Sequence, residues 1–235
     1  MMRTRLAAAA ILLAISSGSH AAGCPSPSSP RPTTTPTARP NVWVAQQQAV
    51  QRNLAAHSYQ AITLGDSIMQ GWSEARLGSA MGMSVLNAGF GQDGTEHILW
   101  RLKTFDWHAQ SPRDVLLLAG TNDIGYPTCD IVWGIRAVVQ TIHRIFPESR
   151  IIVTSLLPRG TNLLDADGKI REVNARLQEA STSAGFQFLD VHDAFTCGQK
   201  TPCPLFQPDL NLHLTKDGYD LLSSELKNFI ATSEK

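Results

Sequence analysis

Short apolar segments alternate with helix-forming segments along most of this 235-residue chain. Each apolar segment is continuous rather than alternating, as in the run Val-Leu-Leu-Leu at 115–118. Continuous runs of this length are typical of strands that are buried on both faces of a sheet. The sequence predicts strands at residues 61–64, 84–87, 114–119, 150–157 and 186–191.

Apolar residues recur at helical spacing between these strands. The pattern predicts helices at residues 44–56, 95–104, 130–146 and 169–183, and a last helix that Thr215 caps. Strands that alternate with helices form a parallel sheet covered on both faces. Right-handed crossovers then bring the carboxyl ends of all strands to one edge, where ligand sites form in open α/β sheets.

The composition fits one globular domain with a substantial core, because 43% of the residues are hydrophobic and 17% are charged. The formal net charge is zero, with 20 basic and 20 acidic residues. No basic stripe points to nucleic acid, so we expect no nucleic-acid partner.

The N-terminus has the pattern of a signal peptide. Arg3 and Arg5 precede an apolar run at 6–15 that is too short to span a bilayer, and small residues follow it. We expect a signal peptide at 1–23, an extended linker rich in Pro, Ser and Thr at 24–40, and the folded domain at 41–235.

Residues 21–24, Ala-Ala-Gly-Cys, also resemble a bacterial lipobox, in which Cys24 would carry a lipid that tethers the protein to a membrane. A lipoprotein and a freely secreted or periplasmic protein both remain open on this pattern. Either alternative places the mature protein outside the bacterial cytoplasm.

The chain has four cysteines. Cys197 and Cys203 flank a turn-rich stretch, and an oxidising compartment favours a disulfide between them. Cys129 is then expected to be a buried free thiol. A zinc site is disfavoured, because the Cys and His spacings match no ligand pattern.

The first predicted strand ends in Gly65-Asp66-Ser67, a turn that would present the Ser67 hydroxyl at the sheet edge. A serine hydroxyl becomes a good nucleophile when a base removes its proton, and His213, just before the last helix, is the candidate base. The alternative is that Ser67 only caps a helix beginning at Ile68.

Two further residues follow successive strands. Gly89 comes after the second strand and Asn122 after the third. The backbone N–H groups of Ser67 and Gly89 and the amide of Asn122 are candidate donors to an oxyanion. We expect Asp66 and Asp123 to bind loop backbone and hold the shape of the site.

These motifs resemble the SGNH (GDSL-type) hydrolase superfamily over residues 58–232. The stretches 87–95 and 155–160 are similar to the branch of the platelet-activating-factor acetylhydrolase catalytic subunits. The resemblance implies a three-layer α/β/α flavodoxin-like sandwich with a five-stranded parallel sheet. It also implies hydrolysis of small acyl groups from alcohols without a metal or other cofactor.

One position departs from the family pattern. An Asp usually stands three residues before the catalytic His, where this chain has Leu210. Asp209 could still orient His213 if the loop contains a bulge, and it is the residue that we favour. Alternatively Asn211 lies nearer, or a backbone carbonyl supports a Ser–His dyad while Asp209 only makes a turn after Pro208.

The sequence therefore predicts an extracytoplasmic serine ester hydrolase that releases short acyl groups, acetyl foremost, from carbohydrate or lipid-type esters. Two alternatives use the same fold. One is a non-catalytic binding protein of the cell surface, and the other is an enzyme that transfers the acyl group to a second alcohol.

Overall fold

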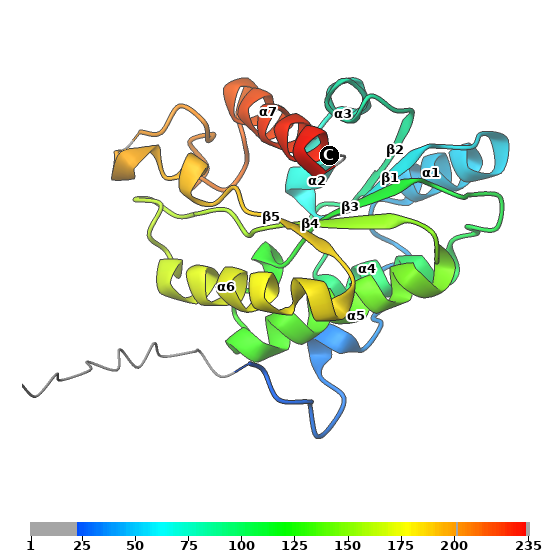
Figure 1. Cartoon of the computed structure of the whole chain (residues 1–235), viewed down its shortest axis with the longest axis horizontal. Helices are drawn as coiled ribbons and strands as arrows, with labels where there is room; N and C mark the ends of the chain where they lie inside the picture. Colours follow the sequence, from blue (N-terminus) through cyan, green and yellow to red (C-terminus); the bar gives the residue numbers. More distant parts are fainter. Residues whose placement is uncertain (1–22, 201, 234–235) are drawn as a thin grey trace, which may run out of the picture.

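The computed structural model describes residues 23–200 and 202–233, which form the expected α/β/α sandwich (Figure 1). Its five-stranded sheet has the order β2-β1-β3-β4-β5, and all neighbouring strands are parallel. The strands are β1 (Ala61–Gly65), β2 (Val85–Gly89), β3 (Asp114–Leu118), β4 (Arg150–Thr154) and β5 (Gln187–Leu189). The last two are shorter than predicted. Leu156, for example, donates its N–H to the Asn174 side chain and not to a neighbouring strand.

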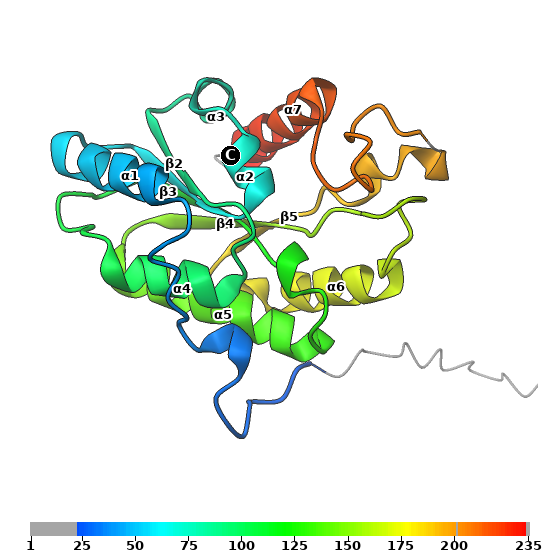
Figure 2. The same cartoon turned by 180° about the vertical axis from the view of Figure 1, so that it is seen from behind.

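Helices cover both faces of the sheet (Figures 1 and 2). One apolar cluster joins the sheet to α1 (Val44–Ala56), α4 (Thr95–Thr104), α5 (Thr128–Ile145) and α6 (Asp167–Ala184). A second cluster joins it to α2 (Ser67–Gly71), α3 (Glu74–Met81) and α7 (Lys216–Ser233). Short 3₁₀ turns occur at Pro32–Thr34, Thr121–Asp123, Asp193–Phe195 and Cys197–Gln199.

Helix α3 follows α2 closely and contains Gly78, and the sequence pattern does not predict it. Its stability comes from its ends and from burial. The Ser73 side chain caps it by accepting the N–H of Arg76, and Leu77 is fully buried against the second cluster. Thr215 caps α7 as expected, because its hydroxyl accepts the N–H of Gly218.

The centre of the carboxyl edge lies where β1 ends between β2 and β3. Gly65 pairs in register with Gly89 on one side and with Leu118 on the other. The chain segments that leave these three strands therefore emerge side by side. The segment after β1 carries Ser67, the segment after β2 leads to α4, and the segment after β3 carries Asn122. These are the segments expected to form the site.

The Pro-rich segment is not the free linker that its composition predicted. Residues 23–43, which we call the N-terminal strap, pack along α4 and α5. Thr33 has no exposed surface, its hydroxyl donates to the carbonyl of Asp130, and its own carbonyl accepts the hydroxyl of Thr95. Gly134 leaves room for this contact, since a Cβ there would lie 2.9 Å from Thr33 Cβ.

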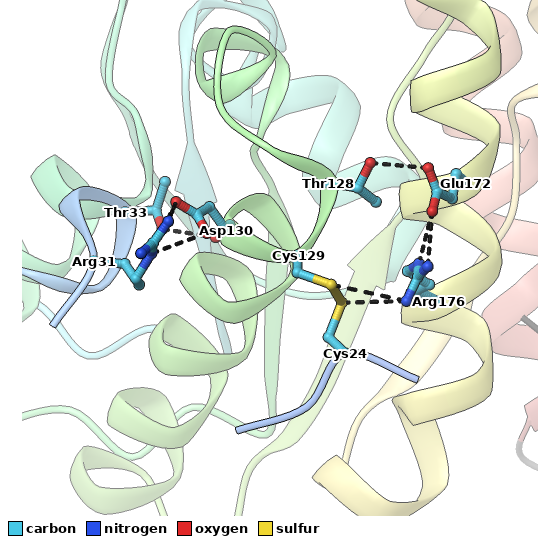
Figure 3. The surroundings of a disulfide bond; sticks show 8 residues. All are labelled: Cys24, Arg31, Thr33, Thr128, Cys129, Asp130, Glu172 and Arg176. Atoms are coloured by element: carbon cyan, nitrogen blue, oxygen red, sulfur yellow. Dashed lines mark hydrogen bonds and ion pairs between the residues drawn. A yellow bond between two sulfur atoms is a disulfide. The ribbon is translucent and has the colours of Figure 1, made fainter. Parts of the chain in front are cut away.

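A disulfide between Cys24 and Cys129 holds the start of the strap (Figure 3). The prediction of a free thiol at Cys129 was therefore wrong. Further along the strap, Arg31 Nη2 lies 2.8 Å from Asp130 Oδ2 in an ion pair. The predicted disulfide Cys197–Cys203 is confirmed.

The disulfide also bears on the proposed lipid anchor. The Cys24 sulfur is bonded to Cys129, so it is not available for a thioether to a lipid. Apart from Gly23, the predicted signal peptide lies outside the described residues. Within residues 23–200 and 202–233, no helix combines the length and the apolar character needed to cross a membrane.

We predict that the strap disulfide contributes more stability than the short one. The two bonds close sequence separations of 105 and 6 residues. In the chain-entropy model a longer loop restricts the unfolded chain more, here by about 2 kcal/mol. The variants Cys24→Ser/Cys129→Ser and Cys197→Ser/Cys203→Ser should differ by about that amount in urea unfolding. Equal losses, or thiols at positions 24 and 129 that titrate in the native protein, would contradict the assignment.

Candidate active site

Ser67 is the first residue of α2 and stands directly beyond β1. Asp66 is the N-cap of this helix, and its Oδ1 accepts the N–H of Ile68 at 2.9 Å. The alternative in which Ser67 itself caps the helix is therefore wrong. Because the capping role falls to Asp66, the half-buried Ser67 hydroxyl is left to make other contacts.

The Ser67 hydroxyl meets His213, which is 146 residues away in the sequence. His213 Nε2 lies 2.9 Å from Ser67 Oγ. On the other side of the ring, Nδ1 is hydrogen-bonded to Asp209 Oδ2. Serine, imidazole and carboxylate thus form one continuous line, the arrangement that passes a proton from a serine to a base.

A bulge in the loop explains how Asp209 reaches the ring from four positions before His213. Leu210 and Asn211 both have positive φ angles, 63° and 49°, so the chain curls at these two residues. The ring nitrogen Nδ1 has Asp209 as its partner, and the Asn211 side chain is bound elsewhere, because its amide nitrogen donates to the carbonyls of Gly160 and Thr161. Of the three alternatives, the geometry corresponds to the one with Asp209.

Asp209 is suited to orient a neutral imidazole. Partial burial raises its pKa, but hydrogen bonds from the ring and from the backbone N–H groups of His213 and Leu212 outweigh this effect, and the pKa lies below its ordinary value. An ionised Asp209 requires a proton on Nδ1 of the ring. The tautomer that results leaves Nε2 free to accept the proton of Ser67.

Gly89 is not placed as an oxyanion donor. It is buried at the end of β2, and its N–H is already donated to Asn87 Oδ1 at 2.9 Å. What the position requires is the absence of a side chain, since a Cβ would lie 2.6 Å from Gln70 N on α2. Gly89 therefore has a packing role and not the donor role that was expected.

Asn122 is the exposed residue of the turn Thr121–Asp123, just beyond β3. Its amide nitrogen donates one hydrogen to the carbonyl of Asp93 at 3.0 Å. The amide nitrogen has two hydrogens, so one remains for a substrate oxygen. The contact also links the turn after β3 to the connection after β2.

Gln92 is a residue that the sequence analysis missed. It is exposed, it has a positive φ of 62°, and its N–H has no partner among residues 23–200 and 202–233. Its neighbours are fixed, because Gly91 donates its N–H to the Gln70 side chain on α2 and Asp93 binds Asn122. The residue with the spare N–H is therefore flanked by contacts to the two elements that carry Ser67 and Asn122. Glutamine is not among the residue types enriched at positive φ, so nothing in the sequence marks this position.

Two buried carboxyls adjoin these residues, and both accept backbone N–H groups from the first turn of a helix and not from a loop as expected. Asp66 binds Ile68 N–H, and Asp123 Oδ2 accepts the N–H of Thr95 at 3.1 Å. Burial raises the pKa of Asp66 to about 7. Burial and then the charge of Glu96 raise the pKa of Asp123 to about 7. Both side chains are therefore largely neutral in weakly acidic solution.

His192, the other histidine near the end of a strand, does not join the site. Its buried ring lies 3.4 Å from both Asp167 and Asp193, beside the start of α6. His97 Nδ1 accepts the N–H of Gly94 at 3.0 Å and so closes the first turn of α4.

The model of the GDSL-like Lipase/Acylhydrolase family matches residues 63–221. The chain belongs to this family. Human platelet-activating factor acetylhydrolase IB subunit alpha1 is 31% identical over 163 residues, which are 68% of this chain and 70% of that protein. The rat subunit alpha2 is 29% identical over 191 residues, 80% of this chain and 83% of that protein. These findings confirm the resemblance and make the protein a carboxylic ester hydrolase.

Solved structures of the family share the fold. A lipase/acylhydrolase from Enterococcus faecalis aligns with a TM-score of 0.56 at 23% identity, covering 73% of this chain and 95% of that one. A catalytic mutant of Axe2, an acetylxylan esterase from Geobacillus stearothermophilus, aligns with a TM-score of 0.58 at 15% identity, covering 74% and 93%.

We predict that the two buried carboxyls make this GDSL-family protein less stable as the pH rises. Their folded pKa values lie near 7 and the ordinary value is 3.8. Between these values the folded protein holds protons that the unfolded chain has lost, so the free energy of unfolding falls with rising pH. Asp123→Asn keeps an acceptor for Thr95 and should flatten this fall.

Urea unfolding at several pH values from 4 to 8 measures the slope, and the exposed Glu148→Gln controls for the mere loss of a carboxyl. Parallel curves for wild type and Asp123→Asn would contradict the raised pKa.

Proposed function

We propose that the protein is an extracytoplasmic serine esterase that releases short acyl groups, acetyl foremost, from carbohydrate or lipid-type esters. The observation that carries the catalytic part is the line of contacts from Ser67 through His213 to Asp209, with 2.9 Å between His213 Nε2 and Ser67 Oγ.

The contacts support a two-step mechanism. Ser67 Oγ attacks the ester carbonyl carbon while His213 Nε2 takes the hydroxyl proton. The tetrahedral intermediate collapses, the bond to the alcohol oxygen breaks, and His213 returns the proton to the departing alcohol. Water then attacks the acyl-enzyme with His213 again as the base, which releases the carboxylic acid and restores Ser67.

The negative charge of the intermediate needs fixed donors. We infer that these are the N–H of Ser67, the N–H of Gln92 and the amide of Asn122. Gln92 takes the place that the sequence analysis gave to Gly89, because the Gly89 N–H is bound to Asn87. Asn122 and Gln92 are both exposed, which lets a substrate oxygen reach them.

The preference for acetyl esters rests on the relatives. The curated relatives are named as acetylhydrolases, and a structural neighbour is named as an acetylxylan esterase. The catalytic imidazole is accessible to solvent, with 36% of its side chain exposed. A site open in this way suits a small acyl group on a bulky alcohol, such as a glycan or a lipid headgroup.

The extracytoplasmic location rests on the cysteines and on the predicted signal peptide. Disulfides persist in secreted and periplasmic proteins and are rare in the cytosol. All four cysteines of the chain are paired, as Cys24–Cys129 and Cys197–Cys203. Because Cys24 is used in this way, we favour a periplasmic or freely secreted protein over a lipid-anchored one.

We predict that activity falls from p-nitrophenyl acetate to butyrate to octanoate and depends on the triad. Ser67→Ala and His213→Ala should each lower kcat by about 10⁴-fold or more. Asp209→Asn should cost nearly as much because it favours the wrong tautomer. Asn211→Ala removes contacts of the bulge with Gly160 and Thr161 but not the contact of Asp209 with the ring, so it should lower kcat less than Asp209→Asn.

The same experiment separates the alternatives. Inert wild type on all three esters, together with no labelling of Ser67 by a fluorophosphonate, would favour a non-catalytic binding protein. Faster product release with an added alcohol, and capture of the acyl group on that alcohol, would favour acyl transfer.

We also predict the position of the oxyanion in a crystal structure of the Ser67 fluorophosphonate adduct. The phosphonyl oxygen should lie within hydrogen-bond distance of Ser67 N, Gln92 N and Asn122 Nδ2, while Gly89 N stays on Asn87. A phosphonyl oxygen bound by Gly89 N would restore the donor that the sequence analysis expected.

A further inference from the structure

The N-terminal strap and the start of α1 bind the segment 89–96, which runs from the last residue of β2 into the first turn of α4. Four hydrogen bonds make this attachment, and each runs from a donor on the strap or on α1 to a backbone carbonyl of the segment. Gln46 binds the carbonyl of Gly89, Trp43 that of Gly91, Arg39 that of Gln92 and Thr37 that of Glu96, at 2.7, 2.8, 2.9 and 3.0 Å. The segment 89–96 includes Gln92 and Asp93, which bear on the oxyanion donors proposed above.

Trp43 acts on the peptide unit that carries the spare N–H. Its indole Nε1 donates to the carbonyl of Gly91, and that carbonyl belongs to the same planar unit as the N–H of Gln92. In a trans peptide the two groups point in opposite directions, so a fixed carbonyl fixes the N–H as well. Gly91 permits the close approach, since a Cβ there would lie 2.7 Å from the Trp43 ring.

Arg39 acts on the next peptide unit. Its Nη1 lies 2.9 Å from the carbonyl oxygen of Gln92 and 3.2 Å from Asp93 Oδ1. The carbonyl of Asp93 in turn accepts the amide of Asn122. Arg39 is therefore linked to two of the proposed oxyanion donors, directly to the Gln92 residue and through Asp93 to Asn122.

We propose that the N-terminal strap is a positioning element of the oxyanion hole, with Trp43 and Arg39 as the positioning residues. This inference rests on the proposed esterase function. Neither residue touches the reacting atoms. They keep the Gln92 N–H and the Asn122 amide aimed before the substrate arrives, which lowers the reorganisation that the transition state requires.

The fold should survive the substitutions that test this proposal. Asp93 is fully buried, but Arg101 Nε also binds it, at 2.6 Å, so removal of Arg39 leaves the carboxylate paired. Trp43→Phe keeps an aromatic ring and removes the indole donor together with one of the two fused rings. Arg31→Ala is the matched control, because Arg31 lies on the same strap and makes its ion pair with Asp130 on α5.

We predict that Trp43→Phe and Arg39→Ala each lower kcat on p-nitrophenyl acetate by about tenfold, less than the loss of a whole donor. KM should stay within about twofold, and the acid limb of the pH profile of kcat should not move, because the Ser67–His213–Asp209 line is untouched. Arg31→Ala should keep kcat within about twofold. Arg39→Lys should recover part of the loss, and so should millimolar guanidinium added to Arg39→Ala.

Several results would overturn the proposal. Wild-type kcat in both Trp43→Phe and Arg39→Ala, an equal loss in Arg31→Ala, or a loss that appears only in KM would each do so. If Arg39→Ala does not fold, as judged by circular dichroism, Trp43→Phe decides alone. Failure of the proposed function looks different, because wild type itself would then neither hydrolyse the ester nor react with a fluorophosphonate.

Discussion

The close approach of α2 to the carboxyl edge of the sheet is the contact on which the site depends. α2 lies over two neighbouring glycines: a Cβ on Gly65 would be 2.8 Å from Met69 Cβ, and one on Gly89 would be 2.6 Å from Gln70 N. No other residue type permits this distance, and it is what puts the first residue of α2, Ser67, at the end of β1.

The same helix also holds the base in place. Tyr219 on α7 donates its hydroxyl to the carbonyl of Ile68 at 2.8 Å, so the helix that begins just after His213 is fixed to the helix that begins with Ser67.

The sheet does not position every part of the site in this way. The connection after β2 leaves the sheet, and its geometry depends on side chains from the strap, from α4 and from the turn after β3. Asp93 is central there, because the fully buried carboxylate binds two arginines while its backbone carbonyl binds Asn122. A buried charge is costly unless it is paired, and removal of every partner would be strongly destabilising. One of its partners, Arg39, comes from the strap that the Cys24–Cys129 disulfide fastens to α5. A segment with the composition of a linker thereby contributes both to stability and to the geometry beside the site.

The sequence was most informative where topology alone decides the outcome. Ser67 and Asn122 follow strands of a parallel sheet, and parallel strands end at a common edge, so their proximity could be predicted without a structure. Asp209 could only be favoured, because its contact with His213 depends on a two-residue bulge with positive φ angles, and of the two residues only Asn211 is of a type that favours them. Gly89 was assigned by residue type, but the structure uses its lack of a side chain and leaves the donor to another position. The pairing of Cys24 with Cys129 joins segments 105 residues apart, and cysteine spacing does not determine such a connectivity.

The buried carboxyls show how stability and chemistry are balanced at this edge. Asp66 precedes Ser67 and Asp123 follows Asn122, so both adjoin groups that we propose to stabilise a negative charge. An ionised carboxylate in such a position would oppose that charge, and the effect is stronger where water is excluded. Burial raises both pKa values to about 7 and thus keeps the carboxyls largely neutral in weakly acidic solution. The same burial makes ionisation unfavourable for the fold at higher pH. A neutral surrounding for the oxyanion and a loss of stability with rising pH are therefore two consequences of one arrangement, because the helix cap on α2 and the Thr95 contact both place an Asp side chain where solvent does not reach it.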